Sequence, residues 1–135
     1  MNEDIKNAIA LAEDTLDDAI YNAKDNRNRV AINRCYYSYF YLIRSLLLEK
    51  NIRAKTHSGL HSEFGKIFIK TAIIPKKFND YLAFLFDQRQ TADYDIEDEL
   101  DKEEVDKAIQ MVEEFINFVK EKYQINRLNR TECNP

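Results

Sequence analysis

Residues 30–48, VAINRCYYSYFYLIRSLLL, constrain the fold of this chain more than any other stretch. At helical spacing their side chains form two adjacent apolar stripes, whereas a helix on a protein surface normally carries one. The first stripe contains Val30, Arg34, Tyr37, Tyr41 and Leu48, and the second contains Ile32, Tyr36, Tyr39, Phe40, Ile43 and Leu47. Two stripes require contacts on most sides, so we predict the central helix of an α-helical bundle. Arg34 and Arg44 interrupt the apolar run. The uncharged stretch between them is shorter than a membrane-spanning helix, which needs about 20 apolar residues.

The composition favours helices throughout. Two glycines and two prolines in 135 residues are too few for a sandwich or barrel built on tight turns. Apolar residues recur at helical spacing in four further segments, at about 3–24, 59–70, 76–93 and 100–123. Ser58 is the expected N-cap of the helix at 59–70. We therefore predict one all-α domain over residues 1–124, followed by a flexible polar tail at 125–135.

The two cysteines lie in different settings and are not expected to form a disulfide. Cys35 lies inside the central helix, where we expect it to be buried and unreactive, and Cys133 lies in the polar tail. The first residues, MNEDIKNAIALAEDTLDDAI, are acidic and amphipathic, unlike a secretory signal or a transit peptide. We therefore expect a cytoplasmic protein with reduced cysteines and no membrane attachment.

The net charge of −4 hides a basic middle section. Residues 44–77 contain eight basic side chains against two acidic ones, while the segments 1–25 and 95–106 are acidic. Two interpretations of the basic section remain open. It could form a local surface that faces phosphate groups, or its lysines could simply solvate the outer faces of helices.

Few side chains are candidates for chemistry. His57 and His61 are four residues apart, a spacing that can place two imidazoles on one face of a helix. No third ligand accompanies them in a recognisable motif, so we predict no metal site and no cofactor. Arg89 and Asp93 share the same spacing, and Tyr94 follows. They form either a surface ion pair with a tyrosine packed at the helix end, or an arginine that binds a phosphate with the tyrosine nearby.

Three segments occur in an order that resembles a known family. They are RCYYSYFYLIRSLLLEKN at 34–51, KTHSGLHSEFGKIFIK at 55–70 and RQTADYD at 89–95. Together they resemble the HEPN domain, in particular its small single-domain prokaryotic branch, over about residues 5–123. The resemblance implies an antiparallel bundle of four to five helices that forms a homodimer. It also implies a toxin–antitoxin pair, in which the HEPN protein is often encoded beside a minimal nucleotidyltransferase.

Active members of that family are metal-independent endoribonucleases with an Arg-x(4–6)-His motif at the dimer interface. The arginine stabilises phosphate charge, and the histidine transfers a proton at the RNA 2′-hydroxyl. Arg89 matches the motif arginine, whereas Tyr94 stands at the histidine position, so the motif here reads Arg-x4-Tyr. A tyrosine, with a reference pKa near 10, is a poor base at neutral pH, but it can donate a hydrogen bond to a phosphate or stack on a base. His57, in the KTH segment, matches another feature of this branch.

Three functional hypotheses follow. The first is a dimeric module of toxin–antitoxin or defence type that binds a nucleotidyltransferase partner and holds nucleotide or RNA phosphate through Arg89, Asp93, Tyr94 and Tyr37. The second is an active endoribonuclease toxin in which Arg89 acts with Tyr94 or His57. The third is a helical interaction protein with a purely structural Arg89–Asp93 pair. In some relatives the partner transferase modifies a tyrosine beside the motif, and Tyr94 is a candidate for that modification.

The sequence leads to two expectations about the structure. A functional site requires Arg89, Asp93 and Tyr94, with or without His57, to converge in one cleft near a two-fold interface, with Tyr36 and Tyr37 lining it from the central helix. Phe84 and Phe86 lie off the buried stripe of the helix at 76–93, which indicates a second contact surface, in another subunit or elsewhere.

Overall fold

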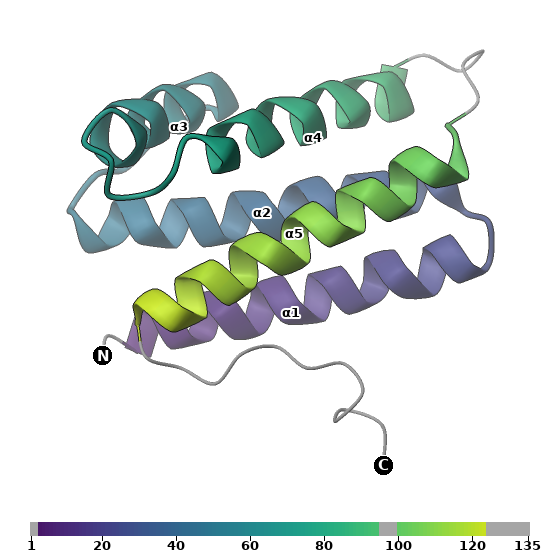
Figure 1. Ribbon diagram of the computed structural model, residues 1–135, viewed down its shortest axis with the longest axis horizontal. Helices are drawn as coiled ribbons and strands as arrows, with labels where there is room; N and C mark the ends of the chain where they lie inside the picture. The colour runs from purple at the N-terminus through teal and green to yellow at the C-terminus, as the bar shows by residue number, and fades with distance from the viewer. Residues whose placement is uncertain (1–2, 95–99, 124–135) are drawn as a thin grey trace.

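The computed structural model describes residues 3–94 and 100–123, and every regular element within these ranges is helical. The elements are α1 (Glu3–Lys24), α2 (Asn28–Glu49), α3 (His57–Phe64), the π-helical turn η1 (Gly65–Ile69), α4 (Lys77–Tyr94) and α5 (Lys102–Lys122). In Figure 1, α1 and α2 run in opposite directions, as do α4 and α5. The prediction of an all-α antiparallel bundle is confirmed. The proposed tail at 125–135 and Cys133 lie outside the described residues.

The α2 helix is the centre of the bundle. It contacts α1, α3, α4 and α5, with α3 and α4 on one side and α1 and α5 on the other (Figure 1). The second predicted stripe is buried apart from the half-buried Phe40, but the first is only partly covered. Val30 and Leu48 are exposed, and Tyr37 and Tyr41 are half-buried. The prediction of contacts on most sides of α2 is therefore correct for one stripe and too broad for the other.

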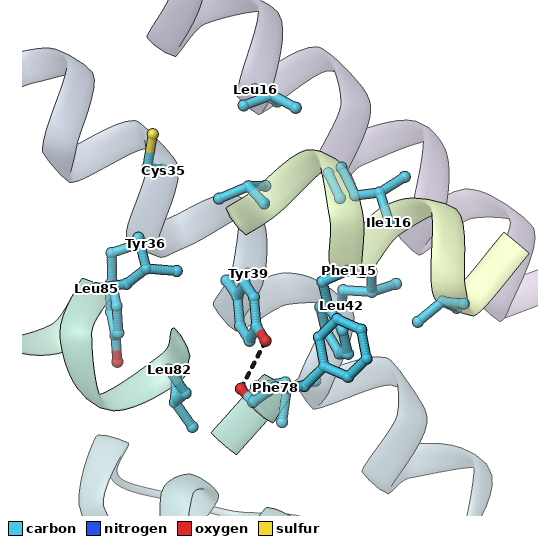
Figure 2. Close-up of a cluster of buried hydrophobic side chains, with 14 of the residues drawn as sticks. Leu16, Cys35, Tyr36, Tyr39, Leu42, Phe78, Leu82, Leu85, Phe115 and Ile116 are labelled. Carbon is cyan, nitrogen blue, oxygen red and sulfur yellow. Dashed lines mark hydrogen bonds between the residues drawn. The ribbon is translucent and has the colours of Figure 1, made fainter. Parts of the chain in front are cut away.

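Aromatic side chains form the middle of the core. The ring of Tyr39 stacks on that of Phe115 at 4.2 Å, and Phe78 and Phe64 lie at 5.2 and 6.1 Å from the same Phe115 ring. The buried Tyr39 hydroxyl donates a hydrogen bond of 2.6 Å to the carbonyl oxygen of Phe78 (Figure 2). A buried hydroxyl without a partner would cost free energy, so this bond fixes the start of α4 against α2.

The start of α3 differs from the prediction. Thr56, not Ser58, is the N-cap, and its Oγ1 accepts a hydrogen bond of 2.9 Å from the Gly59 amide. The helix consequently begins at His57, two residues earlier than expected, and continues directly into η1. A threonine oxygen satisfies one of the free amides of a helical first turn. The cap therefore places His57 on an ordered helical turn.

Cys35 and the two surplus aromatic residues of α4 all have partners within the chain. Cys35 is buried, and burial together with the nearby Glu113 raises the pKa of its thiol to about 12, as expected for an unreactive cysteine. The Phe86 ring contacts the rings of Tyr36 and His61 at 5.7 and 4.9 Å. The Lys107 amine of α5 lies 5.3 Å from the centre of the Phe84 ring. The second contact surface of α4 thus lies in this chain, and these aromatics give no support to a second subunit.

None of the helices in the two described ranges combines the length and the apolar character that a membrane-spanning helix requires.

Candidate functional site

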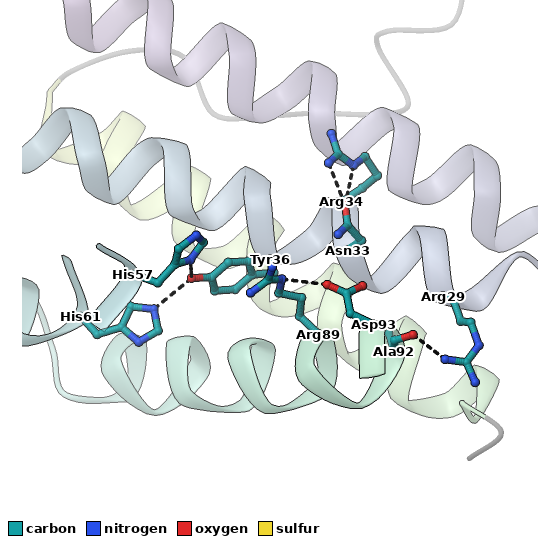
Figure 3. A network of polar contacts seen from close by, with 9 residues as sticks. All are labelled: Arg29, Asn33, Arg34, Tyr36, His57, His61, Arg89, Ala92 and Asp93. Carbon is teal, nitrogen blue, oxygen red and sulfur yellow. Dashed lines mark hydrogen bonds and ion pairs between the residues drawn. The ribbon is translucent and has the colours of Figure 1, made fainter. Parts of the chain in front are cut away.

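Side chains from three helices converge where α2, α3 and α4 pack together. Tyr36 projects from α2, His57 and His61 from α3, and Arg89 from α4 (Figure 3). The central position of α2 brings them together, because α3 and α4 pack on the same side of α2 (Figure 1), and Tyr36 contacts residues of both. We call these four residues, with Tyr37, the α2–α4 cluster.

The Tyr36 hydroxyl links the two histidines. It lies 2.7 Å from Nδ1 of His57 and 3.1 Å from Nε2 of His61. A phenol has one proton, so it donates to one imidazole nitrogen and accepts from the N–H of the other. The prediction that His57 and His61 share a helix face is confirmed, since both reach the same hydroxyl oxygen. Within the described ranges, no three His, Cys, Asp or Glu side chains gather in an arrangement that could hold a metal ion.

Arg89 is held against aromatic rings and is largely shielded from solvent. Its Cζ lies 5.4 Å from the ring centres of both Tyr36 and Tyr37, and its side chain is 15% exposed. Its Nε lies 3.0 Å from Oδ2 of Asp93, but the Nε hydrogen is not aligned for a hydrogen bond. The guanidinium therefore makes no hydrogen bond among the described residues. Arg89 thus keeps a positive charge and unused N–H donors beside the two rings.

The last turn of α4 is anchored to α2 next to this pair. Arg29 donates a hydrogen bond to the carbonyl oxygen of Ala92, which places a cation at the helix C-terminus (Figure 3). An open hollow of about 240 Å³ lies beside it, lined by Arg29, Val30, Asn33 and Asp93. Solvent therefore reaches the carboxylate side of the Arg89–Asp93 pair.

The electrostatics keep both imidazoles neutral at pH 7. Burial, and then the Arg89 cation, lower the pKa of His57 below its ordinary value of 6.5. Burial and the neighbouring His57 lower the pKa of His61. Burial raises the pKa of the Tyr36 hydroxyl well above its ordinary value, an effect that Arg89 only partly offsets. At neutral pH the cluster therefore contains a neutral imidazole, which can accept a proton, beside a permanent cation.

We expect Arg89→Gln to raise the pKa of His57, because the substitution removes a positive charge that disfavours the imidazolium ion. The pKa of His61 should change less, since Arg89 is not among its causes. An NMR titration of the ring carbons and nitrogens checks both shifts. Arg27→Gln, which removes an exposed arginine paired with Asp25, serves as the control and should shift neither pKa. An unchanged His57 pKa in Arg89→Gln would contradict the arrangement.

The same pKa values determine how the folded state responds to acid. Both imidazoles bind a proton less readily in the folded chain than in the unfolded chain. Their contribution to stability is therefore fully present above the unfolded value of about 6.5 and is lost as the pH falls toward the folded values.

Comparison with known proteins identifies the family. The model of the HEPN domain matches residues 5–122. This chain belongs to the HEPN family.

Individual relatives agree with this assignment. The Methanocaldococcus jannaschii protein named Putative toxin MJ0142 is 41% identical over 97 residues, which cover 72% of this chain and 65% of that protein. A Thermotoga maritima UPF0332 protein is 34% identical over 108 residues, 80% of this chain and 82% of its own length. A second Methanocaldococcus jannaschii protein, named Putative toxin MJ0605, is 30% identical over 120 residues, 89% of each chain.

The structure brings most of the predicted HEPN site residues together, with one exception. Arg89, Asp93, Tyr37 and His57 lie in or beside the α2–α4 cluster. Tyr94 is 73% exposed and makes no hydrogen bond or ring contact among the described residues. Five residues at 100° each turn the chain about 140° past the starting face of a helix, so positions 89 and 94 point in different directions. The expected convergence of Tyr94 with Arg89 is not present in this chain.

Two contributors escaped prediction from the sequence. The spacing of His61 from His57 suggests only a metal ligand, whereas in the HEPN bundle the His61 imidazole contacts the Tyr36 hydroxyl. The apolar pattern places Phe40 in the core, yet its ring stacks on that of His57 at 4.7 Å. The four-residue spacing of the histidines was the one available signal. The contact of Phe40 with His57 joins residues seventeen positions apart in the printed sequence, and no local pattern predicts it.

Proposed function

We propose that this HEPN protein is the toxin-type member of a two-protein module, and that Arg89 binds a phosphate group of RNA or of a nucleotide. Two relatives carry the word toxin in their names, which supports the first part. The second part rests on one observation, the shielded guanidinium of Arg89 with unused N–H donors. A minimal nucleotidyltransferase partner and a homodimer belong to the same proposal and rest on the family resemblance.

The chemistry of Arg89 suits a phosphate better than its present partner. A guanidinium group donates two parallel hydrogen bonds to phosphate oxygens, and these charge-assisted bonds are stronger than neutral ones. Asp93 makes a single ion-pair contact with Nε and leaves the remaining donors unused. The rings of Tyr36 and Tyr37 fix the plane of the group, which reduces the entropy lost on binding.

We expect Arg89→Gln to weaken the binding of a fluorescein-labelled RNA oligonucleotide roughly 10- to 100-fold, the loss of hydrogen bonds to a charged group. Fluorescence anisotropy measures the dissociation constant. Arg89→Lys keeps the charge but not the paired donors, so its affinity should lie between those of Arg89→Gln and the wild type. Arg27→Gln again controls for net charge. If Arg89→Gln and Arg27→Gln bind with equal affinity, Arg89 has no special role.

A second function is favoured by the position of His57. Its neutral imidazole lies against Tyr36 and Phe40, and the Arg89 charge acts on it. In an endoribonuclease, His57 would accept the proton of an RNA 2′-hydroxyl. The 2′-oxygen would then bond to the adjacent phosphorus as the bond to the 5′-oxygen breaks, and the leaving 5′-oxygen would take a proton from water. Arg89 would stabilise the charge on the phosphoryl oxygens, and no metal is needed.

A further inference from the structure

Two tyrosines lie between two arginines along the partly uncovered side of α2. Arg34, Tyr37, Tyr41 and Arg44 follow one another at steps of three, four and three residues, so they share one helix face. At 1.5 Å per residue they extend over about 15 Å. We call these four residues the outer strip of α2. Arg34, Tyr37 and Tyr41 belong to the stripe that the bundle leaves partly uncovered, and Arg44 lies three residues beyond Tyr41.

The side chains of the outer strip contact one another in sequence. Cζ of Arg34 lies 5.5 Å from the Tyr37 ring centre, and Cζ of Arg44 lies 5.4 Å from that of Tyr41. The two tyrosine rings are 5.9 Å apart and inclined at 41°. Both rings are half-buried, and Arg44 is exposed. The strip thus exposes part of two aromatic rings between two guanidinium groups.

The outer strip is positively charged in a protein that is acidic overall. The α2 helix contains no Asp or Glu before Glu49, its last residue. Arg34 donates hydrogen bonds of 3.1 and 2.7 Å to the amide oxygen of Asn33, a neutral partner. Among the described residues, neither Arg34 nor Arg44 pairs with a carboxylate, although the chain has 24 Asp and Glu side chains. Unneutralised arginines on one face attract polyanions.

The strip is continuous with the α2–α4 cluster. Tyr37 belongs to both, because its ring contacts Arg89 at 5.4 Å and the ring of His57 at 6.0 Å. A phosphate on Arg89 would therefore lie near the middle of the strip. Arg34 would be available on one side of it and Arg44 on the other.

We propose that the outer strip binds an unpaired segment of RNA, with bases stacked on Tyr37 and Tyr41 and neighbouring phosphates on Arg34 and Arg44. The inference rests on the proposed function, since it names the form of RNA that the Arg89 site accepts. Unpaired bases can leave their own stack and lie on aromatic rings, whereas the bases of a duplex have no free faces. The short spacing between the rings suits two or three consecutive nucleotides.

The test compares two forms of the same RNA by fluorescence anisotropy. The probe is a labelled strand of about eight nucleotides without self-complementarity, a typical length for such sites. It is used alone and annealed to its complement. We expect the wild type to bind the single strand more tightly. Tyr41→Ala should weaken single-strand binding about tenfold, the loss of one stacked base, with little change for the duplex.

Matched variants separate stacking from charge. Tyr21→Ala removes a tyrosine that is 75% exposed on α1 and should leave the affinity unchanged. Tyr41→Phe keeps the ring and should retain binding, which also shows that the site folds. Arg44→Gln should reduce the slope of log K against log salt by about 0.7, the loss of one phosphate contact to a single strand. Arg27→Gln should leave that slope unchanged.

Three results would overturn the inference. The first is equal affinity for single strand and duplex, and the second is unchanged single-strand binding by Tyr41→Ala. The third is a Tyr41→Ala variant whose mass, measured by sedimentation, is lower than that of the wild type while its RNA affinity is unchanged. That result would mean that a second copy of the chain covers the strip. In each case a loss of binding by Arg89→Gln would still support the proposed phosphate site. Normal binding by Arg89→Gln with weakened binding by Tyr41→Ala would instead reject that site.

Discussion

Replacing Phe115 with alanine is expected to lower the free energy of unfolding by about 3–5 kcal/mol, the usual cost of removing a buried phenylalanine. Phe115 is fully buried, and its ring contacts those of Tyr39, Phe64 and Phe78 from three other helices. Alanine would leave a cavity that these rings cannot fill without leaving their rotamers. The loss is large beside the about 5–15 kcal/mol that holds a typical domain folded.

Urea denaturation followed by circular dichroism measures this loss. Phe118 provides a matched control, because it lies on the same helix and contacts Phe78 at 4.9 Å but is only half-buried. Phe118→Ala should therefore cost less than Phe115→Ala. Equal losses at the two positions would mean that the aromatic centre of the core is not where the structure places it.

The second large effect concerns catalysis. If the protein is an endoribonuclease, His57→Ala should reduce RNA cleavage in EDTA by about 10²–10⁴-fold, the usual contribution of a general base. Tyr94→Phe should have little effect, because the Tyr94 side chain is exposed and makes no hydrogen bond or ring contact among the described residues. Because burial and Arg89 lower the pKa of His57, the wild-type rate should also persist as the pH falls below 6.5.

Three controls make the cleavage assay decisive. Arg89→Gln should abolish the same activity, since the arginine stabilises charge on the phosphate. Arg27→Gln, with its arginine in an exposed pair, should cleave as the wild type does. Equal cleavage by His57→Ala and the wild type would exclude His57 as the base. No cleavage by the wild type would leave phosphate binding as the function of the site.

The helices could be predicted closely because their apolar spacing and their interruptions are local features. The segments at 3–24 and 76–93 agree with α1 and α4 within one residue at each end. The start of α3 was misplaced because Thr56 and Ser58 are both good cap residues, and backbone geometry decides between them. The first stripe of α2 is less buried than its apolar pattern predicts, for another reason. Apolar periodicity shows which faces can be buried, but not whether the chain has another helix to cover each one.

The candidate site was predictable only in part. The four-residue spacings of Arg89 with Asp93 and of His57 with His61 correctly place each pair on one helix face. The contact of the Tyr36 hydroxyl with His57 joins positions 21 apart, and it depends on how α3 packs across α2. Motif alignment suggested Tyr94 for the histidine role, whereas the turn of the helix directs it elsewhere. Local spacing therefore identified the pairs, and tertiary packing decided which pairs meet.

Tyr36 also limits how this protein can evolve. Its ring is fully buried in the core, and its hydroxyl bridges the two histidines beside Arg89. A substitution of Tyr36 that alters the chemistry of the site must also fill the same space between three packed helices. Most substitutions at this position would therefore destabilise the fold, whatever their effect on function. Tyr94, which is 73% exposed, is under no such packing constraint. Lineages that retain this bundle should therefore diversify around Tyr36 and seldom at it.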